Sequence, residues 1–390
     1  MKIESVDFFY LSMPEVLDIG DGSQDALLVR VRAGGFEGWG ECEASPLTSI
    51  ASYVCPMSHS ACKPLKYSIE GRNINTIDDI YALSKLVHEN SLDLLQADHT
   101  LSGVDIALYD LLGKKMGVPV FELLGYKKVF PKLPYASQLF GNDPAETLSK
   151  AKTAAAAGFK AVKFGWGPFG KNLECDREHL LAAREGVGRD AFLMIDAGTV
   201  WGEAYEDGFK RLSHLEEINA YWLEEPFFNG ALHSYKTLAD SEPRVPLAGG
   251  EGCNNYLQAE AMMNYSGIKF IQIDAGRIGG ITVAKRVVDH AIQKGISYVN
   301  HTFTSHLALS ASLQAYAGVE KDFISEYPVE LKQLAVDIGK QKIERDKDGY
   351  IHVPERSGLG IDVDIQALKK YIVEVQIEVA GKIVYQTPAS

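Results

Sequence analysis

The chain has 390 residues, of which 46% are hydrophobic, and a formal net charge of −13. This length predicts two folding units and an ample core. The basic residues form no cluster and no apolar run is long enough for a bilayer, which argues against nucleic-acid binding and membrane insertion. Acidic residues come too early in residues 1–15 for a signal peptide.

The cysteine content, like the lack of a signal-peptide pattern, favours a cytoplasmic protein. Five are present, no CxxC pair occurs, and a disulfide framework or a zinc site is therefore not expected. Reduced thiols, packed as small hydrophobic groups, fit a cytoplasmic protein. The five are Cys42, Cys55, Cys62, Cys175 and Cys253.

The first part of the chain has the pattern of an α+β unit. Residues 2–13, 25–35 and 36–44 alternate apolar and polar side chains, which predicts antiparallel strands with a turn at Gly34-Gly35. Residues 76–90 and 101–117 have helical periodicity, and the second helix should end at Gly117. Residues 45–75 show no clear period and are predicted to form a polar loop.

From about residue 131 short apolar runs alternate with amphipathic helical stretches. Eight such strands with helical crossovers predict a parallel α/β barrel. An open doubly wound sheet is the alternative, but it would need a glycine-rich phosphate turn after its first strand, and none is there. The tail beyond residue 345 is expected to pack on the N-terminal unit. The predicted strands lie at 134–139, 161–165, 192–196, 220–224, 246–251, 268–274, 297–301 and 323–327.

A parallel barrel places its active site at the C-terminal ends of its strands. Seven of the predicted strands end with a polar residue that could serve there. Neighbours in this series are separated by 23 (251 to 274) to 33 (163 to 196) residues, about one strand and one helix. These side chains should therefore converge on one mouth. They are Lys163, Asp196, Glu224, Glu251, Asp274, His301 and Glu326.

Three of the seven are carboxylates on consecutive strands, namely Asp196, Glu224 and Glu251. Each alone could be a solvated loop carboxylate. Three that lie close together repel one another unless a cation neutralises them. Ligation by oxygen alone, with room for water and substrate, suits Mg²⁺.

The next two strands offer Asp274 and His301. A carboxylate beside an imidazole fixes its tautomer and raises its basicity, which makes a general base. A structural hydrogen-bonded pair is the alternative. His290 and His306 lie on predicted helices and are expected to be surface or core residues.

Strand parity turns Lys163 and Gly165 toward the barrel interior and Lys160 away from it. A buried ammonium beside a carboxylate-bound metal would stabilise negative charge that develops on a substrate. The alternative is a lysine that only extends its amine to solvent.

At these residues the sequence resembles the mandelate racemase subgroup of the enolase superfamily, and the likeness covers nearly the whole chain. Residues 101–117 are similar to its signature helix, and Asn300-His301 belongs to a further motif. Residues 354–364 are similar to its closing motif. The metal-ligand motifs and the aspartate motif that follows them match MIDAG at 194–198, LEEP at 223–226, GGEG at 249–252 and IDAGRIGG at 273–280.

The resemblance implies a (β/α)₇β TIM-type barrel with an α+β capping domain. The cap would comprise residues 1–128, completed by 346–390, and the barrel residues 129–345. Specificity loops from the cap, near 14–24 and 45–60, would cover the site, and the protein would be a homo-oligomer.

One departure from the subgroup bears on the reaction. Members with two opposed bases carry Lys-x-Lys on the second strand, whereas this chain has Lys163-Phe164-Gly165. Residues 165–168 instead resemble the rhamnonate type of acid-sugar dehydratase, which relies on the His–Asp dyad alone. Gly198 also replaces an asparagine that is frequent in the subgroup.

The expected reaction is the dehydration of a sugar acid. Mg²⁺ would chelate the substrate carboxylate, His301 would remove the α-proton, and Lys163 would stabilise the ene-diolate. Glu326, if protonated, would hydrogen-bond the carboxylate. Loss of the 3-hydroxyl then gives a 2-keto-3-deoxy acid. Cycloisomerisation, epimerisation or racemisation, and a catalytically silent binding protein remain as alternatives.

Overall fold

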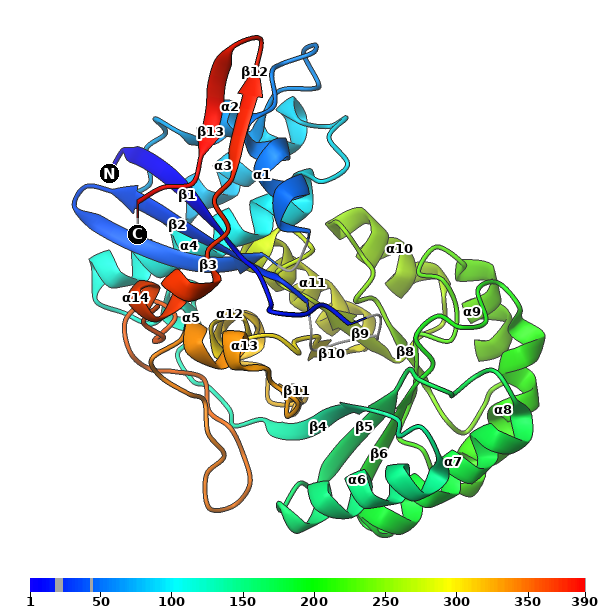
Figure 1. Ribbon diagram of the computed structural model, residues 1–390. Helices are drawn as coiled ribbons and strands as arrows, with labels where there is room; N and C mark the ends of the chain where they lie inside the picture. Colours follow the sequence, from blue (N-terminus) through cyan, green and yellow to red (C-terminus); the bar gives the residue numbers. More distant parts are fainter. Residues whose placement is uncertain (18–23, 43–44, 390) are drawn as a thin grey trace.

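A computed structural model describes residues 1–17, 24–42 and 45–389. Two units lie side by side, and the C-terminal hairpin lies with the N-terminal strands, far from the barrel helices (Figure 1). Within the described residues, no helix combines the length and the apolar character needed to cross a bilayer.

The N-terminal unit is built on an antiparallel sheet in the order β1-β2-β3. Its strands are β1 (Ile3–Leu11), β2 (Ala26–Ala33) and β3 (Phe36–Cys42). Helices α3 (Ile77–Asn90) and α4 (Ala97–Met116) accompany it, and α4 ends at Gly117, which has φ 73°. A Cβ on Gly38 would lie 2.0 Å from the carbonyl oxygen of Ala107, so glycine is what lets α4 lie directly on β3.

The prediction of a polar loop over residues 45–75 is wrong. This stretch contains α1 (Pro46–Val54) and α2 (Leu65–Ile69). Pro46 begins α1, and the helix buries Ile50 and Tyr53, whose ring lies 4.8 Å from that of Phe8. Helices this short gain their stability from tertiary packing, so their sequence periodicity is weak.

The second unit is a parallel eight-stranded sheet in the order β10-β9-β8-β7-β6-β5-β4-β11. The side chain of Asn300 joins its two end strands, because Asn300 Oδ1 accepts hydrogen bonds from the Ser325 hydroxyl at 2.9 Å and from the Glu326 backbone N–H at 3.1 Å. The sheet is thereby closed into a barrel. Its strands are β4 (Leu133–Leu139), β5 (Ala161–Gly165), β6 (Phe192–Asp196), β7 (Leu223–Glu224), β8 (Leu247–Gly249), β9 (Phe270–Ile273), β10 (Ser297–Asn300) and β11 (Ile324–Pro328).

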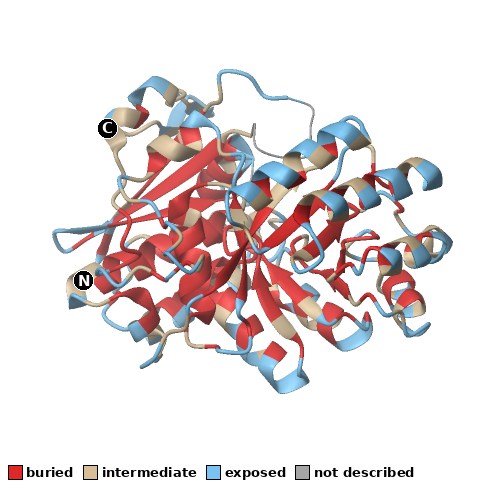
Figure 2. Cartoon of the chain, turned by 90° about the horizontal axis from the view of Figure 1, so that it is seen from below, coloured by how far each residue is buried: buried red, intermediate tan, exposed pale blue. Residues whose placement is uncertain are grey.

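Helices surround the barrel, with buried faces toward the strands and exposed faces outward (Figure 2). A cluster that includes Tyr135, Met194 and Trp222 fills part of the barrel interior. The predicted parallel α/β barrel is thus confirmed. The helices are α5 (Val120–Leu123), α6 (Pro144–Ala156), α7 (Leu173–Val187), α8 (Tyr205–Glu217), α9 (Leu232–Ala239), α10 (Tyr256–Tyr265), α11 (Gly280–Lys294), α12 (His306–Tyr316) and α13 (Gln333–Ile338).

The C-terminal tail contacts both units in turn. Ile351 exchanges two backbone hydrogen bonds of 2.9 Å with Lys132, just before β4. After α14 (Ile365–Leu368) the chain forms a hairpin of β12 (Gln376–Val379) and β13 (Lys382–Gln386), and the Tyr385 hydroxyl donates to the Phe8 carbonyl at 2.6 Å. The domain boundaries at 128/129 and 345/346 stay a prediction.

A buried carboxylate on α4 joins the cap to the barrel. Asp105 accepts hydrogen bonds from the Thr282 backbone N–H at 3.0 Å and from its hydroxyl at 2.5 Å, at the start of α11. Burial raises the pKa of Asp105 to about 7, although these hydrogen bonds act in the opposite direction. The fold therefore favours the protonated acid.

We expect Asp105→Asn to stabilise the protein above neutral pH. An aspartate whose pKa rises on folding loses stability as pH climbs from its unfolded pKa through its folded one, here from about 4 to about 7. The neutral amide avoids this loss, which by linkage is at most on the order of 4 kcal/mol. Thermal unfolding at pH 5 and pH 8 measures it, and a gain confined to pH 5 would contradict the burial argument.

Candidate active site

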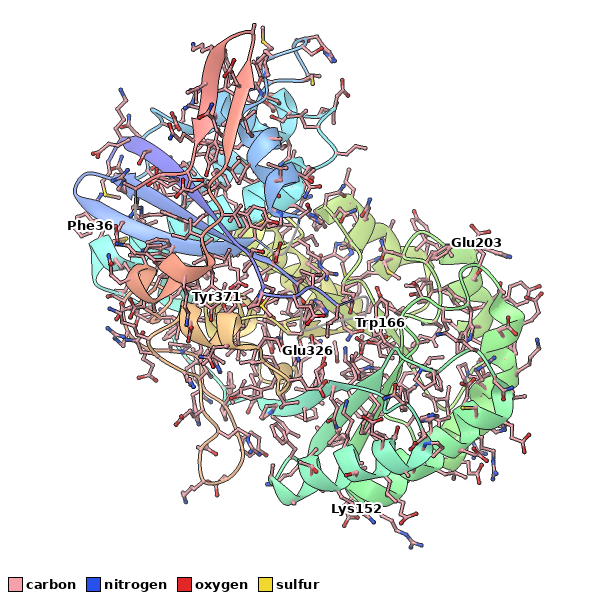
Figure 3. The ribbon with its side chains drawn as sticks, in the orientation of Figure 1. Phe36, Lys152, Trp166, Glu203, Glu326 and Tyr371 are labelled. Atoms are coloured by element: carbon pink, nitrogen blue, oxygen red, sulfur yellow. The ribbon has the colours of Figure 1, made fainter. Side chains whose placement is uncertain are left out.

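The structure brings all seven predicted strand-end residues together at one mouth of the barrel. Each is buried, with at most 8% of its surface exposed. Figure 3 labels Glu326 and Trp166 on the side of the barrel that faces the N-terminal unit. Lys163 lies within β5 and Glu326 within β11, whereas the other five end their strands or follow them by one or two residues: Asp196, Glu224, Glu251, Asp274 and His301.

Asp196, Glu224 and Glu251 form a compact carboxylate cluster. One oxygen from each lies within 4.8 Å of the others. Burial raises the pKa of Glu224 to about 7 and that of Glu251 to about 8, and neighbouring carboxylates add to the effect. Three buried carboxylates this close together repel one another, and a hard divalent cation bound by their oxygens would relieve the repulsion.

Local contacts fix two of these carboxylates. Glu224 accepts from the Trp222 indole N–H at 2.8 Å and from the Lys163 ammonium at 2.5 Å. Asp196 accepts from the Gly198 backbone N–H at 2.8 Å. Both side chains are therefore held in place by groups of the barrel itself.

Glu225 was missed from the sequence, although it is the second acidic residue of LEEP. It is buried, it has φ 39°, and the Gly252 backbone N–H lies 3.4 Å from its carboxylate. Burial, followed by the charges of Asp196 and Glu224, raises its pKa to about 7. The doubled glutamate was the available signal for a fourth carboxylate beside the cluster.

His301 and Asp274 form the expected pair, with 2.8 Å between His301 Nδ1 and Asp274 Oδ2. Asp274 is oriented in turn by the Gly276 backbone N–H at 2.6 Å. The other ring nitrogen, Nε2, faces Glu251 Oε2 at 3.3 Å. Burial alone would lower the pKa of His301, but Glu251, Glu326 and the Asp274 hydrogen bond raise it to about 10.

Lys163 points into the barrel, as strand parity predicted. Its Nζ lies 2.5 Å from Glu224 Oε1, 2.9 Å from Glu326 Oε1 and 3.3 Å from Asp196 Oδ2. Burial would lower the pKa of Lys163, yet these three carboxylates raise it well above its usual value. Lys160 points away and donates to the Asp348 carbonyl at 3.1 Å.

Glu326 carries a negative charge in this arrangement. Burial would raise its pKa, but Lys163 and His301 lower it to about 2. Its Oε2 accepts from the Thr302 backbone N–H at 2.6 Å. The expected hydrogen bond from a protonated Glu326 to the substrate would need the acid form, which Lys163 and His301 disfavour, and this role stays a prediction.

The site leaves no room for the side chain of a second base at residue 165. A Cβ on Gly165 would lie 2.8 Å from Oδ2 of Asp196, so no side chain fits there unless that carboxylate moves. The next residue, Trp166, adopts φ 57° and lays its ring against Gly198. A Cβ on Gly198 would lie 2.8 Å from this ring, which gives a physical reason for glycine in place of asparagine.

Two cavities adjoin the site. The smaller, of about 230 Å³, is lined by Lys163, Asp196 and Trp166. The larger, of about 480 Å³, lies between the cap and the barrel and shares Phe303 and Lys332 with the smaller one.

The two predicted specificity loops contribute to the larger cavity through Val16 and Pro46, and residues 18–23 lie outside the described residues.

His306 is buried and accepts from the Ile343 backbone N–H at 3.2 Å, whereas His290 contacts the Tyr256 hydroxyl at 2.9 Å. Neither histidine lines a cavity beside the site.

A capped parallel barrel with three acidic residues, a lysine and a His–Asp pair at its strand ends defines the enolase class of proteins. Residues 146–367 match the family described as enolase C-terminal domain-like. Residues 12–125 match the mandelate racemase/muconate lactonizing enzyme N-terminal domain. The chain therefore belongs to the mandelate racemase/muconate lactonizing enzyme family of the enolase superfamily, and the resemblance found in its sequence is confirmed.

The relatives carry out more than one reaction. A predicted mandelate racemase from Rhodobacter sphaeroides has a crystal structure with TM-score 0.96 and 53% identity, covering 100% of both chains. Arabinonate dehydratase of Saccharolobus solfataricus is 29% identical over 70% of this chain and 71% of its own. D-galactarolactone cycloisomerase of Agrobacterium fabrum is 27% identical over 70% and 73%.

Proposed function

We propose that this protein is a Mg²⁺-dependent dehydratase of sugar acids. The observation that carries the proposal is the one-sided site: His301 and Asp274 face the carboxylate cluster, and Asp196 fills the space where a second base would stand at residue 165. Epimerases and racemases need a base on each face of the carbon. A single base suits the loss of a proton and a hydroxyl.

In this proposal Asp196, Glu224 and Glu251 hold the cation, which supplies positive charge to a bound carboxylate. Glu251 helps to hold His301 protonated in the metal-free site, and a cation that neutralised Glu251 would favour the neutral imidazole. Nε2 of that imidazole would remove the α-proton, since Nδ1 is engaged by Asp274. Lys163 stabilises the negative charge that forms on the substrate. The imidazolium of His301 would then give its proton to the departing 3-hydroxyl, which leaves as water, and the enol that remains would tautomerise to a 2-keto-3-deoxy acid.

Cycloisomerisation is the second candidate. The Agrobacterium fabrum relative is a D-galactarolactone cycloisomerase. That reaction could use the same abstraction of a proton beside a carboxylate, with an intramolecular leaving group in place of a free hydroxyl. The two candidates share the site and differ only in the product.

The test is a screen of mono- and diacid sugars with Mg²⁺ in D₂O, read by NMR and by a semicarbazide assay for 2-keto acids. We expect α-proton exchange and keto-acid formation from at least one acid. If every active substrate gave only an epimer, dehydration would be the wrong assignment. Mg²⁺-dependent thermal stabilisation without exchange from any acid would favour a catalytically silent protein.

A further inference from the structure

We propose that Asn300 is a positioning residue for the reaction, and that its side-chain amide sets the spacing between His301 and Glu326. This role rests on the proposed function, in which His301 is the base. Asn300 is 0% exposed and lines neither of the two cavities beside the site. It would therefore act on the reaction through its neighbours and not through the substrate.

The side chain of Asn300 lies on the outer face of the barrel. Asn300 ends β10 directly before His301, and successive side chains of a strand point to opposite faces. His301 points to the barrel mouth, where its Nε2 faces Glu251. Asn300 points the other way, toward α12, where the Tyr316 hydroxyl donates to Asn300 Oδ1 at 2.9 Å.

The amide of Asn300 takes the place of a backbone ladder. Strands β10 and β11 stand at the two ends of the sheet order, and among the described residues no backbone pairing joins them. Asn300 Oδ1 accepts from the Glu326 backbone N–H at 3.1 Å, and Asn300 Nδ2 donates to the Glu326 carbonyl at 3.3 Å. One side chain thus holds both backbone groups of Glu326 across the β10/β11 seam, as a neighbouring strand would.

The remaining hydrogen-bonding positions of this amide are also used. The Ser325 hydroxyl donates to Asn300 Oδ1 at 2.9 Å, and Asn300 Nδ2 donates to the Thr302 hydroxyl at 3.1 Å. The Thr302 backbone N–H in turn donates to Glu326 Oε2 at 2.6 Å. A buried network in which every polar group has a partner is rigid, so the two strand ends are fixed relative to each other.

The groups on the two sides of the seam are those of the proposed reaction. On one side, the His301 backbone N–H donates to the Ile273 carbonyl of β9 at 2.9 Å. On the other side, Glu326 places its Oε2 3.9 Å from His301 Nε2 and its Oε1 2.9 Å from Lys163 Nζ. If the seam opened, Glu326 and Lys163 would shift relative to the base. A misplacement of about 1 Å can cost roughly 10²-fold in rate.

The test is Asn300→Ser, which adds no charge but is too short to span both backbone groups of Glu326. The full chain is assayed with Mg²⁺ and an accepted acid for kcat, KM and α-proton exchange in D₂O. We expect kcat and the exchange rate to fall by about tenfold to a hundredfold, because the reacting groups lose their spacing. KM and Mg²⁺ affinity should stay close to their wild-type values.

Thr302→Val and Thr302→Ser test the same seam if Asn300→Ser fails to fold. Valine keeps the shape of threonine but removes the hydroxyl that accepts from Asn300, whereas serine keeps that hydroxyl. The valine variant should lose kcat several-fold, and the serine variant should retain it. The matched control is Ser310→Ala, which removes another buried hydrogen bond of α12, to the Leu359 carbonyl at 2.5 Å. It should lower the unfolding temperature and leave kcat unchanged.

A second readout does not depend on turnover. In NMR spectra of the Mg²⁺-loaded protein with ¹⁵N-labelled histidine, the ring signals of His301 are assigned with His301→Asn. They should shift or broaden in Asn300→Ser and stay unchanged in Ser310→Ala. Unchanged His301 signals in Asn300→Ser would overturn the positioning role.

The kinetic outcomes separate this role from the function on which it rests. A loss of kcat in Asn300→Ser no larger than that in Ser310→Ala would overturn the role and leave dehydration standing, as would a rise in KM alone. Absence of exchange with every acid in the wild type would overturn the proposed function, and the His301 signals would then decide the positioning role by themselves.

Discussion

His301→Asn is expected to abolish both turnover and exchange of the α-proton into D₂O. A positioned acid–base group contributes roughly 10²–10⁴-fold, and one imidazole that serves both steps should cost the upper end of this range or more. Lys163 is a poor substitute, because three carboxylates within 3.3 Å hold it as an ammonium ion. Kinetic assay and NMR exchange on the same preparation measure the two losses.

Asp274→Asn is the informative companion variant. It leaves the imidazole in place but weakens the contact at Nδ1, so both rates should fall less than in His301→Asn. His352→Asn, at an exposed histidine that pairs with Asp346, is the matched control and should retain activity. If His301→Asn still exchanged the α-proton at near wild-type rate, Lys163 would have to be the base, and a syn elimination would lose its support.

The barrel could be predicted because its physics is repetitive. Each strand is a short apolar run followed by one amphipathic helix, and the C-terminal ends of the strands meet at one mouth of the barrel. The sequence interval of one strand and one helix was therefore enough to predict that Asp196, Glu224 and Glu251 lie close together. In the structure one oxygen from each lies within 4.8 Å of the others. The order of the strands follows from the chain once the sheet is parallel.

Features that depend on contacts between distant elements could not be predicted. The charge state of Glu326 is set by Lys163 and His301, which come from two other strands. Helix α1 is stabilised by burial of Ile50 and Tyr53, the latter against Phe8 of β1, and no local period reveals such contacts. The sequence shows that Trp166 follows Gly165, but it does not predict where the indole ring lies. The ring lies against Gly198, and the backbone of Trp166 has φ 57°.

Glu224→Gln should leave a folded protein that no longer binds Mg²⁺. The side chain is 0% exposed, and glutamine keeps its size. Its single oxygen can accept from Trp222 or from Lys163 but not from both, because the two donate to different oxygens of Glu224. What it loses is one of three negative charges in the cluster. Because burial raises the pKa of Glu224 and Glu251 to about 7 and 8, protons compete with the metal, and wild-type affinity should increase as pH rises from 6 to 9.

Calorimetric titration and thermal unfolding with and without Mg²⁺ measure this prediction. The wild type should gain stability from the metal by mass action, whereas Glu224→Gln should not. In chelator the variant should still unfold in one cooperative transition, at a temperature no higher than that of the wild type, because Lys163 loses one of its carboxylate partners and an amide N–H₂ faces a donor. Glu203→Gln, at an exposed position on the outer side of the barrel, is the control and should bind as the wild type does (Figure 3). Wild-type affinity in Glu224→Gln would remove Glu224 from the ligand set and leave Asp196, Glu251 and Glu225 as the carboxylates to test next.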